Sequence, residues 1–238
     1  MVNRRAIAVI PARGGSKRLL RKNEMPFAGK PMLVHSIEAA QATGFFDRIL
    51  VSTDDPGIAA AACAAGAEAP FLREDHADDH APVSAATILA VQTAMLHYGE
   101  RYEVVVQLMA NCPLRGAESI KAGFARLARQ DVQFLISAFR YGWMNPWWAA
   151  TLGPDGRPTA LFPQVGDTRS QDLPPLFCPS GAVWVATWEA LEAAGTFFGP
   201  GHVYFDIGWH EAVDIDDTED LAFAQAVWEM RARVQARR

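Results

Sequence analysis

The chain has 238 residues, of which 50% are hydrophobic and 21% are charged, so it can bury a sizeable core and is not expected to be disordered. Its formal net charge of −5 provides no overall basic field, which argues against nucleic acid and anionic membranes as partners.

The amino-terminal residues and the cysteines predict a cytoplasmic protein. The first apolar run, residues 6–10, ends at Pro11 and is too short for a signal peptide or a membrane span. Cys63, Cys112 and Cys178 are far apart and form no CxxC pair, which suits a reducing compartment. We therefore expect a cytoplasmic location and no membrane partner.

Three runs rich in Ile and Val predict buried strands at residues 6–10, 48–52 and 103–109. Helical patterns separate these strands. Such alternation is typical of an α/β fold in which helices cover both faces of a parallel sheet.

Helix start and stop signals place the helices between and after these strands. Pro31 predicts a first helical residue and Gly44 a stop, while Asp55 predicts the N-cap of an alanine-rich helix that ends at Gly66. Residues 84–98 and 117–129 predict two further helices.

The second half of the chain changes character at Phe139. Residues 139–179 are rich in Pro, Gly and Trp and lack periodicity, which indicates an excursion from the sheet. Strands are then expected at residues 182–186 and 202–205, followed by a long helix that begins near Thr218.

A basic loop follows the first predicted strand, where open α/β sheets bind ligands. Gly14 and Gly15 would let backbone amides approach phosphate oxygens, and Arg13, Lys17 and Arg18 would add charged hydrogen bonds. The loop matches neither the GxGxxG fingerprint nor the P-loop. The alternative is a solvated basic loop without a ligand.

Two carboxylates near the carboxyl terminus are candidates for a metal site. Asp214 and Asp216 are two residues apart, so in an extended segment both point to one side. Oxygen ligands of this kind favour Mg²⁺ held together with substrate phosphates. The alternative is that Asp216 or Asp217 only caps the following helix.

Other chemistries have little support. The six histidines have no metal-ligand spacing, and Cys112 has no identifiable base. Asp54 could contact a nucleotide or structure a turn. The aromatic residues between Tyr141 and Trp148 favour a core or a subunit interface over a ligand platform.

Several ordered motifs resemble the sialic-acid cytidylyltransferase family, which makes CMP-sialate, CMP-pseudaminate and CMP-legionaminate. The motifs are IPARGGSKR at residues 10–18 with RKN at 21–23, VSTDD at 51–55, RSQDLP at 169–174 and DID at 214–216. RSQDLP is similar to the pseudaminate branch. The Kdo cytidylyltransferases lack the GGSK and RKN pattern and are a poorer match.

The resemblance implies a Rossmann-like, mostly parallel sheet of the nucleotide-diphospho-sugar transferase type. It implies one domain over residues 1–238, with residues 139–180 as an excursion that forms a homodimer and helps to build the sugar pocket. The implied reaction transfers CMP from CTP to the anomeric hydroxyl of a nonulosonic acid and releases pyrophosphate, with Mg²⁺ or alternatively Mn²⁺.

The resemblance also assigns roles to individual residues. Arg13, Lys17 and Asp216 are the expected catalytic residues, and Asp214 and Asp216 the expected metal ligands. Arg169, Gln171 and Ser180 are expected at the sugar. The nucleotide site is expected to contain Ala12, Arg13, Gly14, Gly15, Ser16, Lys17, Lys22, Asn23, Asp54 and Asn111.

Two departures leave the sugar open. Residues 109–115 read MANCPLR where sialate enzymes have QPTSPLR, and residues 178–182 read CPSGA where they have RPNGA. An arginine for the sugar carboxylate is therefore missing, and Arg169 could replace it. Two rival functions remain, a nucleotidylyltransferase for another sugar acid such as Kdo and a non-catalytic regulator that binds CTP.

Overall fold

The computed structural model describes residues 4–73, 82–129 and 132–236, and its centre is a six-stranded sheet. The strands lie in the order β10-β6-β9-β5-β1-β4, and only β9 runs antiparallel to its neighbours. They are β1 (Ala6–Pro11), β4 (Arg48–Ser52), β5 (Val104–Gln107), β6 (Phe134–Arg140), β9 (Phe177–Thr187) and β10 (Val203–Asp206). This confirms the predicted α/β class with a mostly parallel sheet.

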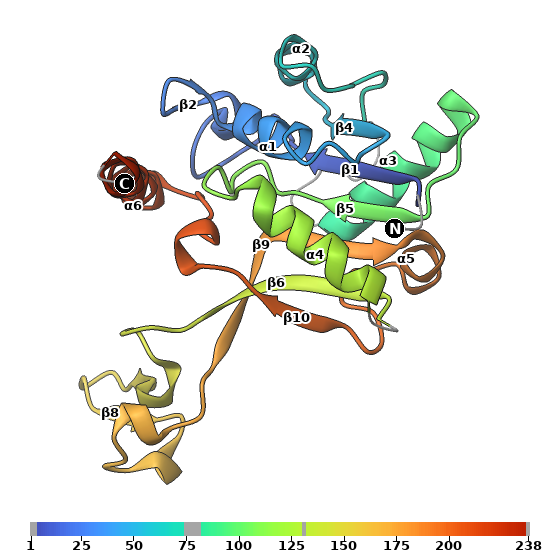
Figure 1. The fold of residues 1–238 in the computed structure, drawn as a ribbon. Coiled ribbons are helices and arrows are strands. Elements are labelled where there is room, and N and C mark those ends of the chain that lie inside the picture. The colour runs from blue at the N-terminus through green and yellow to red at the C-terminus, as the bar shows by residue number, and fades with distance from the viewer. Residues whose placement is uncertain (1–3, 74–81, 130–131, 237–238) are drawn as a thin grey trace.

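Helices cover both faces of the sheet (Figure 1). The core on one face includes side chains of α1 (Met32–Gln41), α2 (Pro56–Ala64) and α4 (Ala117–Arg129). The core on the other face includes side chains of α3 (Val83–Tyr98) and α5 (Trp188–Ala194). Because successive strand residues point to opposite faces, Ile10 packs into the first core and Val9 into the second.

A third apolar cluster attaches the carboxyl-terminal helix α6 (Thr218–Gln235) to the amino-terminal half. Val227 and Ala224 of α6 pack with Leu19 and Phe27 from the segment that follows β1. Ile215, which directly precedes the helix, is fully buried in the same cluster. Residues close to the two ends of the chain are thereby held together.

The excursion leaves the sheet between β6 and β9 and projects away from the main body (Figure 1). Residues 141–176 carry the hairpin of β7 (Ala150–Leu152) and β8 (Pro158–Ala160) and three short 3-10 helices, η2 (Pro146–Trp148), η3 (Pro163–Val165) and η4 (Ser170–Asp172). Trp143 is 88% exposed and Leu152 is 71% exposed. The two ends of the predicted excursion belong to the sheet, where residues 139–140 pair with residues 177–178 and Pro179 pairs with Ala138.

The remaining short elements lie near the two ends of the chain. The 3-10 helix η1 (Lys22–Glu24) and the small hairpin of β2 (Pro26–Phe27) and β3 (Lys30–Pro31) join β1 to α1, and the 3-10 helix η5 (Trp209–Glu211) follows β10. In the described part of the chain, none of the helices has both the length and the apolar character needed to cross a bilayer.

The predicted elements agree with the structure in most places. The strands predicted at 6–10, 48–52 and 103–109 are the adjacent strands β1, β4 and β5, and Asp55 caps α2 by accepting from the amides of Gly57 and Ile58. Pro31 is the N-cap of α1 instead of its first residue. Strand β6 was not predicted, and the strand predicted at 182–186 is the second half of the longer β9.

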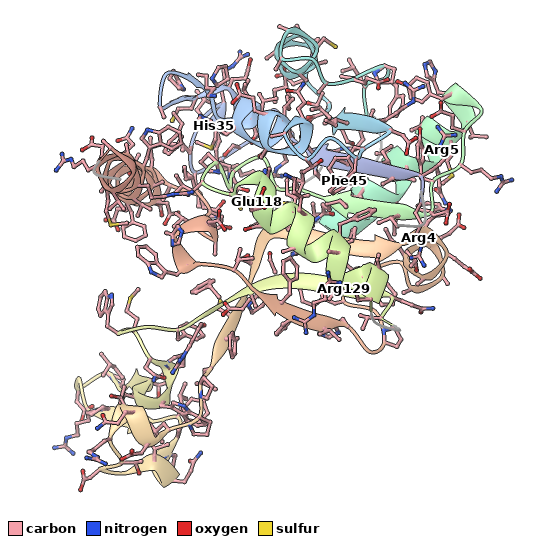
Figure 2. All side chains as sticks on the ribbon, viewed as in Figure 1. Arg4, Arg5, His35, Phe45, Glu118 and Arg129 are labelled. Carbon is pink, nitrogen blue, oxygen red and sulfur yellow. The ribbon has the colours of Figure 1, made fainter. Side chains whose placement is uncertain are left out.

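A charge network joins the amino-terminal ends of β1, β4 and β5, at the edge of the sheet opposite to the carboxyl ends of these strands. Arg48 donates to Glu100 at 2.8 and 3.0 Å and to Glu68 at 2.8 Å, and its guanidinium lies 3.6 Å from the centre of the Tyr98 ring. Arg5, labelled in Figure 2, reaches Glu100 at 3.2 Å. The network connects β1 and β4 to the turn between α3 and β5.

Replacing Glu100 by Gln should lower thermal stability at neutral pH, and the deficit should shrink in acid. Hydrogen bonds from Arg48 and Tyr102 lower the pKa of Glu100 from 4.5 to about 2. A lowered folded-state pKa contributes stability that is complete above the unfolded value and is lost as the pH falls towards 2. Thermal unfolding of both proteins between pH 7 and pH 2 measures this. Glu229→Gln, in an exposed pair on α6, is the control, and a constant deficit would contradict the assignment.

Candidate active site

A cavity of about 290 Å³ lies where β1 and β5 end, and it contains residues from both ends of the chain. Seven predicted site residues line it: Arg13, Ser16, Lys22, Asn23, Asn111, Asp214 and Asp216. Six residues that were not assigned to the site also line it: Pro11, Arg73, Val83, Ala86, Met109 and Ala110. The sheet therefore places its cavity at the carboxyl ends of parallel strands, as expected for an open α/β fold.

The basic loop, residues 12–23, is held by its own backbone and by the end of β4. The buried Ala12 donates its amide to the Ser52 carbonyl at 2.9 Å, so it extends the sheet and does not line the cavity. The amide of Gly14 donates to Asp54 at 2.9 Å. Asn23, only 6% exposed, donates to the Arg13 carbonyl at 2.9 Å. These bonds fix the position at which Arg13 enters the cavity.

Different physical requirements explain the two glycines of the basic loop, Gly14 and Gly15. A Cβ on Gly14 would lie 2.7 Å from Oδ2 of Asp55, so the close approach of the loop to the start of α2 requires a glycine there. A Cβ on Gly15 would meet no atom of the described residues within 4 Å, and Gly15 is exposed. The open space at Gly15 fits the predicted approach of a phosphate, whereas the Gly14 amide is already bonded to Asp54.

The acidic pair lies in the segment that leads into α6. Asp214 and Asp216 line the cavity while Ile215 between them is fully buried, as the two-residue spacing predicts. Asp217 caps α6 by accepting from the amides of Glu219 and Asp220. Both interpretations of this motif therefore hold, with different aspartates, because Asp217 serves as the cap and leaves Asp214 and Asp216 at the cavity.

Asn111 joins the acidic segment to the loop that follows β5. The Asn111 side-chain amide donates to the Ile215 backbone carbonyl at 3.2 Å and to Oδ1 of Asp216 at 3.3 Å. The Asn111 backbone carbonyl accepts from the Ile215 backbone amide at 2.9 Å. Asn111 is 6% exposed. Its observed role is therefore to position the acidic pair, in addition to lining the cavity.

Asp216 forms ion pairs with two residues of the basic loop. Lys22 Nζ lies 2.7 Å from Oδ1 of Asp216, and Arg18 Nη2 lies 2.6 Å from Oδ2. Burial works against the charged carboxylate, but the hydrogen bond and charge of Lys22, followed by those of Arg18, outweigh it and lower the pKa of Asp216. Asp216 is therefore ionised at neutral pH.

Asp214 has a different electrostatic environment. The cavity opens it to solvent, but protein atoms surround it on its other sides, and this desolvation raises the pKa of its carboxyl. The nearby charge of Asp216 raises the pKa further. A cation placed between the two carboxylates would relieve both effects.

These two carboxylates fit a magnesium ion better than a transition metal. In the described part of the chain, no group of three or more His, Cys, Asp or Glu residues could hold a metal by itself. The remaining ligands would have to be water and phosphate oxygens, and Mg²⁺ commonly binds in this way through one or two carboxylates.

Arg73 is a cationic residue of the site that the sequence did not reveal. It follows α2 in a segment whose backbone continues along β4, with the Arg73 amide donating to the Thr53 carbonyl at 2.7 Å. It is 9% exposed, it lines the cavity, and its Nε has no hydrogen-bond partner among the described residues. A buried guanidinium with an unused donor is suited to an anionic ligand. No short motif marks this arginine, because only the pairing along β4 brings it to the cavity.

The altered segment after β5 forms one wall of the cavity. The Met109 carbonyl accepts from Ser36 at 3.1 Å and from Arg115 at 3.3 Å, and Arg115 also donates to the Ala182 carbonyl at 2.9 Å. Arg115 is 3% exposed, and its burial lowers its pKa to about 10. Hydrogen bonds to Met109 therefore connect the MANC segment, residues 109–112, to α1 directly and to β9 through Arg115.

The residues expected at the sugar lie outside this cavity. Arg169 and Gln171 are on the excursion, where Arg169 pairs with Asp172 at 2.8 Å and is exposed. Ser180 is buried in β9, and its hydroxyl lies 2.9 Å from that of Ser137 on β6. Within one chain, the structure does not bring these three residues to the nucleotide residues.

Lys17 and Asp54 lie beside the cavity without lining it. Lys17 is exposed on the basic loop between the cavity residue Ser16 and Arg18. Asp54 follows β4 and accepts from the Gly14 amide, so it links the basic loop to the end of β4, a role that differs from the local turn that the sequence favoured.

Sequence comparisons identify relatives over nearly the whole chain. Residues 7–143 match the family model described as Cytidylyltransferase. The chain is 32% identical over 226 residues to a pseudaminic acid cytidylyltransferase of Campylobacter jejuni, covering 94% of this chain and 96% of that protein. It is 29% identical to a CMP-N,N'-diacetyllegionaminic acid synthase of Legionella pneumophila, covering 95% and 97%. An N-acylneuraminate cytidylyltransferase of Streptococcus agalactiae is 29% identical, and 51% of its length is matched.

A solved structure shares the fold. The CMP:2-keto-3-deoxy-manno-octonic acid synthetase complexed with CTP superposes with a TM-score of 0.70 over 95% of this chain and 99% of that one. Its sequence identity of 16% limits this similarity to the fold.

Cys112 should be unreactive in the native protein. Burial raises the pKa of its thiol to about 12, and the charge of Asp214 contributes in the same direction, so the reactive thiolate is absent at pH 8. A Cys63→Ser, Cys178→Ser double variant leaves Cys112 as the only thiol. We expect no reaction with a thiol reagent until denaturant unfolds the chain. Rapid native labelling would contradict this, and wild-type protein, with the exposed Cys63, is the positive control.

Proposed function

The chain belongs to the cytidylyltransferase family, and from this we propose that it transfers CMP from CTP to the anomeric hydroxyl of a nonulosonic acid and releases pyrophosphate. The observation that carries the proposal is the single cavity in which Arg13, Lys22 and Arg73 face the carboxylates of Asp214 and Asp216. Cations for a triphosphate and ligands for a divalent metal thus occur together. A regulator that only binds CTP would have less need of both.

The triphosphate of CTP is proposed to lie against the basic loop. Arg13, Lys22 and Arg73 line the cavity and supply charged donors, and the exposed amide of Gly15 can approach a phosphate without steric hindrance. Val83 and Ala86 in the first turns of α3 also line the cavity, so the positive end of that helix dipole faces the ligand. Lys17 and Ser16 extend the same surface.

Asp214 and Asp216 are proposed to hold Mg²⁺, with Mn²⁺ as an alternative. When bound, the ion would neutralise negative charge that develops on the phosphates and would favour ionisation of the attacking hydroxyl. The protein positions the α-phosphorus so that the anomeric hydroxyl attacks in line and pyrophosphate leaves. Positioning and electrostatics supply most of the catalysis, and no dedicated base is required.

The acceptor is proposed to be a nonulosonic acid because the relatives that match along nearly the full chain are named for pseudaminic and N,N'-diacetyllegionaminic acids. We also propose a homodimer in which the excursion packs against the partner and brings Arg169 or Gln171 to a sugar pocket. The exposed Trp143 and Leu152 support this, since a free chain would leave them in water. A cytoplasmic location remains a prediction, supported by three cysteines that are all free thiols.

Pyrophosphate release should require CTP, a divalent cation and one nonulosonic acid. A panel of N-acetylneuraminate, legionaminate, pseudaminate and Kdo, each with CTP and Mg²⁺, measures this, and mass spectrometry identifies the CMP-sugar. Chelation of the metal is the negative control, and ATP, GTP and UTP test the base. Turnover with Kdo alone would reject the nonulosonic acceptor. Tight CTP binding without turnover on any acceptor would favour the regulator.

Asp214→Asn should reduce turnover by about 100-fold or more at saturating Mg²⁺, because one of two metal ligands is lost and the charge on the phosphates is less well neutralised. Folding should persist, since neutralising Asp214 also removes its repulsion from Asp216. Steady-state kinetics and thermal unfolding measure the two effects. Asp155→Asn, on the exposed excursion hairpin, is the control for loss of one acidic charge. Near-wild-type turnover would reject the metal proposal.

A further inference from the structure

Both carboxylate oxygens of Asp216 are occupied by protein cations. Lys22 Nζ is 2.7 Å from Oδ1, and Arg18 Nη2 is 2.6 Å from Oδ2, while the Asn111 amide also approaches Oδ1 at 3.3 Å. Within the described residues, no ion pair joins Asp214 to a cation. The two proposed metal ligands thus differ in the free protein, because one is already neutralised and the other is not.

A divalent cation therefore competes with the protein for Asp216. A metal that binds either oxygen must share it with Arg18 or Lys22 or displace that cation, and it is repelled by both as it approaches. The two cations are not equally held. The Lys22 side chain is 14% exposed and lines the cavity, whereas the Arg18 side chain is 66% exposed and extends from the loop surface. Arg18 is the residue that can leave with little cost in packing.

A polyphosphate offers these cations a different partner. Phosphate oxygens accept strong hydrogen bonds from guanidinium and ammonium groups, and arginine can bind phosphate with two parallel bonds. The cavity that Lys22 lines is also the cavity of Arg13 and Arg73, so a bound triphosphate would place its charge within reach of the same loop. Nucleotide and Asp216 then compete for Lys22 and Arg18.

We propose that Arg18 and Lys22 are exchange cations, which neutralise Asp216 in the free protein and move to the triphosphate when the nucleotide binds, leaving the carboxylate open to the metal. The proposal rests on the proposed nucleotide site and gives Arg18 of the basic loop a specific function, as a cation that moves between Asp216 and the triphosphate. Metal and nucleotide affinities are then coupled through the protein, and this coupling is reciprocal.

The first test measures Mn²⁺ binding to the nucleotide-free protein by electron paramagnetic resonance of free Mn²⁺. Arg18→Gln should bind Mn²⁺ roughly threefold to fivefold more tightly than wild type, because an ion pair of this exposure opposes the metal by a modest amount. Arg21→Gln is the matched control, since Arg21 is in the same loop and pairs with Glu24 instead of Asp216. It should change Mn²⁺ affinity by less than about twofold.

Asp216→Asn decides whether the effect passes through this carboxylate. In the Asp216→Asn background, Arg18→Gln should no longer change the Mn²⁺ affinity, because the exchange partner is absent. Equal gains for Arg18→Gln and Arg21→Gln, or a gain that persists without Asp216, would reduce the effect to general charge and overturn the proposal. An unchanged affinity in Arg18→Gln would overturn it as well.

A second measurement separates this proposal from the proposed function. Calorimetry of CTP binding in excess chelator should show tighter binding to Asp216→Asn than to wild type, because Arg18 and Lys22 are already released. Asp214→Asn, which removes an equal charge at the same cavity, should give a smaller gain. Equal gains would overturn the exchange. Failure of every protein to bind CTP would instead reject the nucleotide site, while the Mn²⁺ result would still report on Asp216 directly.

Discussion

The ion pair between Lys22 and Asp216 joins the loop after β1 to the segment before α6, and the arrangement of the site in the free protein depends on this pair. The residues are 194 positions apart and their charged atoms are 2.7 Å apart. Neither segment is held in place by the sheet, because the basic loop lies beyond the end of β1 and the acidic segment lies between η5 and α6. The pair is possible because the buried cluster of Leu19, Ile215 and Val227 packs directly beneath these two segments.

The sheet determines what else reaches this point. Because β1 and β5 are adjacent and parallel, the basic loop and the loop at Asn111 leave the same edge, and Asn111 then pairs with the Ile215 backbone. The antiparallel β9 closes the other side of β5, where Arg115 links the Met109 and Ala182 carbonyls. Polar residues on three separated segments are thus fixed by buried and partly buried hydrogen bonds, so a cavity of defined charge can exist without a ligand.

Local sequence signals were sufficient where the determinant is local. Spacing and residue type predict the Ile- and Val-rich strands β1, β4 and β5, the Asp55 cap, and the placement of Asp214 and Asp216 on one side of the chain. Strand β6, FLISAFR, was missed although its first three residues are apolar, and its distant partners in β9 and β10 do not account for this, because the predicted β1 also pairs with the distant β5. Arg73 was missed because only its pairing with Thr53 beyond β4 brings it to the cavity, and the glycine at position 14 was assigned to phosphate although it is required by the approach of Asp55.

Long-range charge placement also explains how an acidic chain can offer a site to a polyanion. The net charge of −5 would repel a triphosphate at a distance, yet Lys22 lines the cavity and Arg18 lies on the adjoining loop surface, with Asp216 as their shared counter-ion. Binding then gives these cations a phosphate partner, and the metal that pairs with the released Asp216 would offset part of the charge that the ligand brings. A site built only from unpaired cations would bind phosphate more strongly, but like-charge repulsion would destabilise the empty loop.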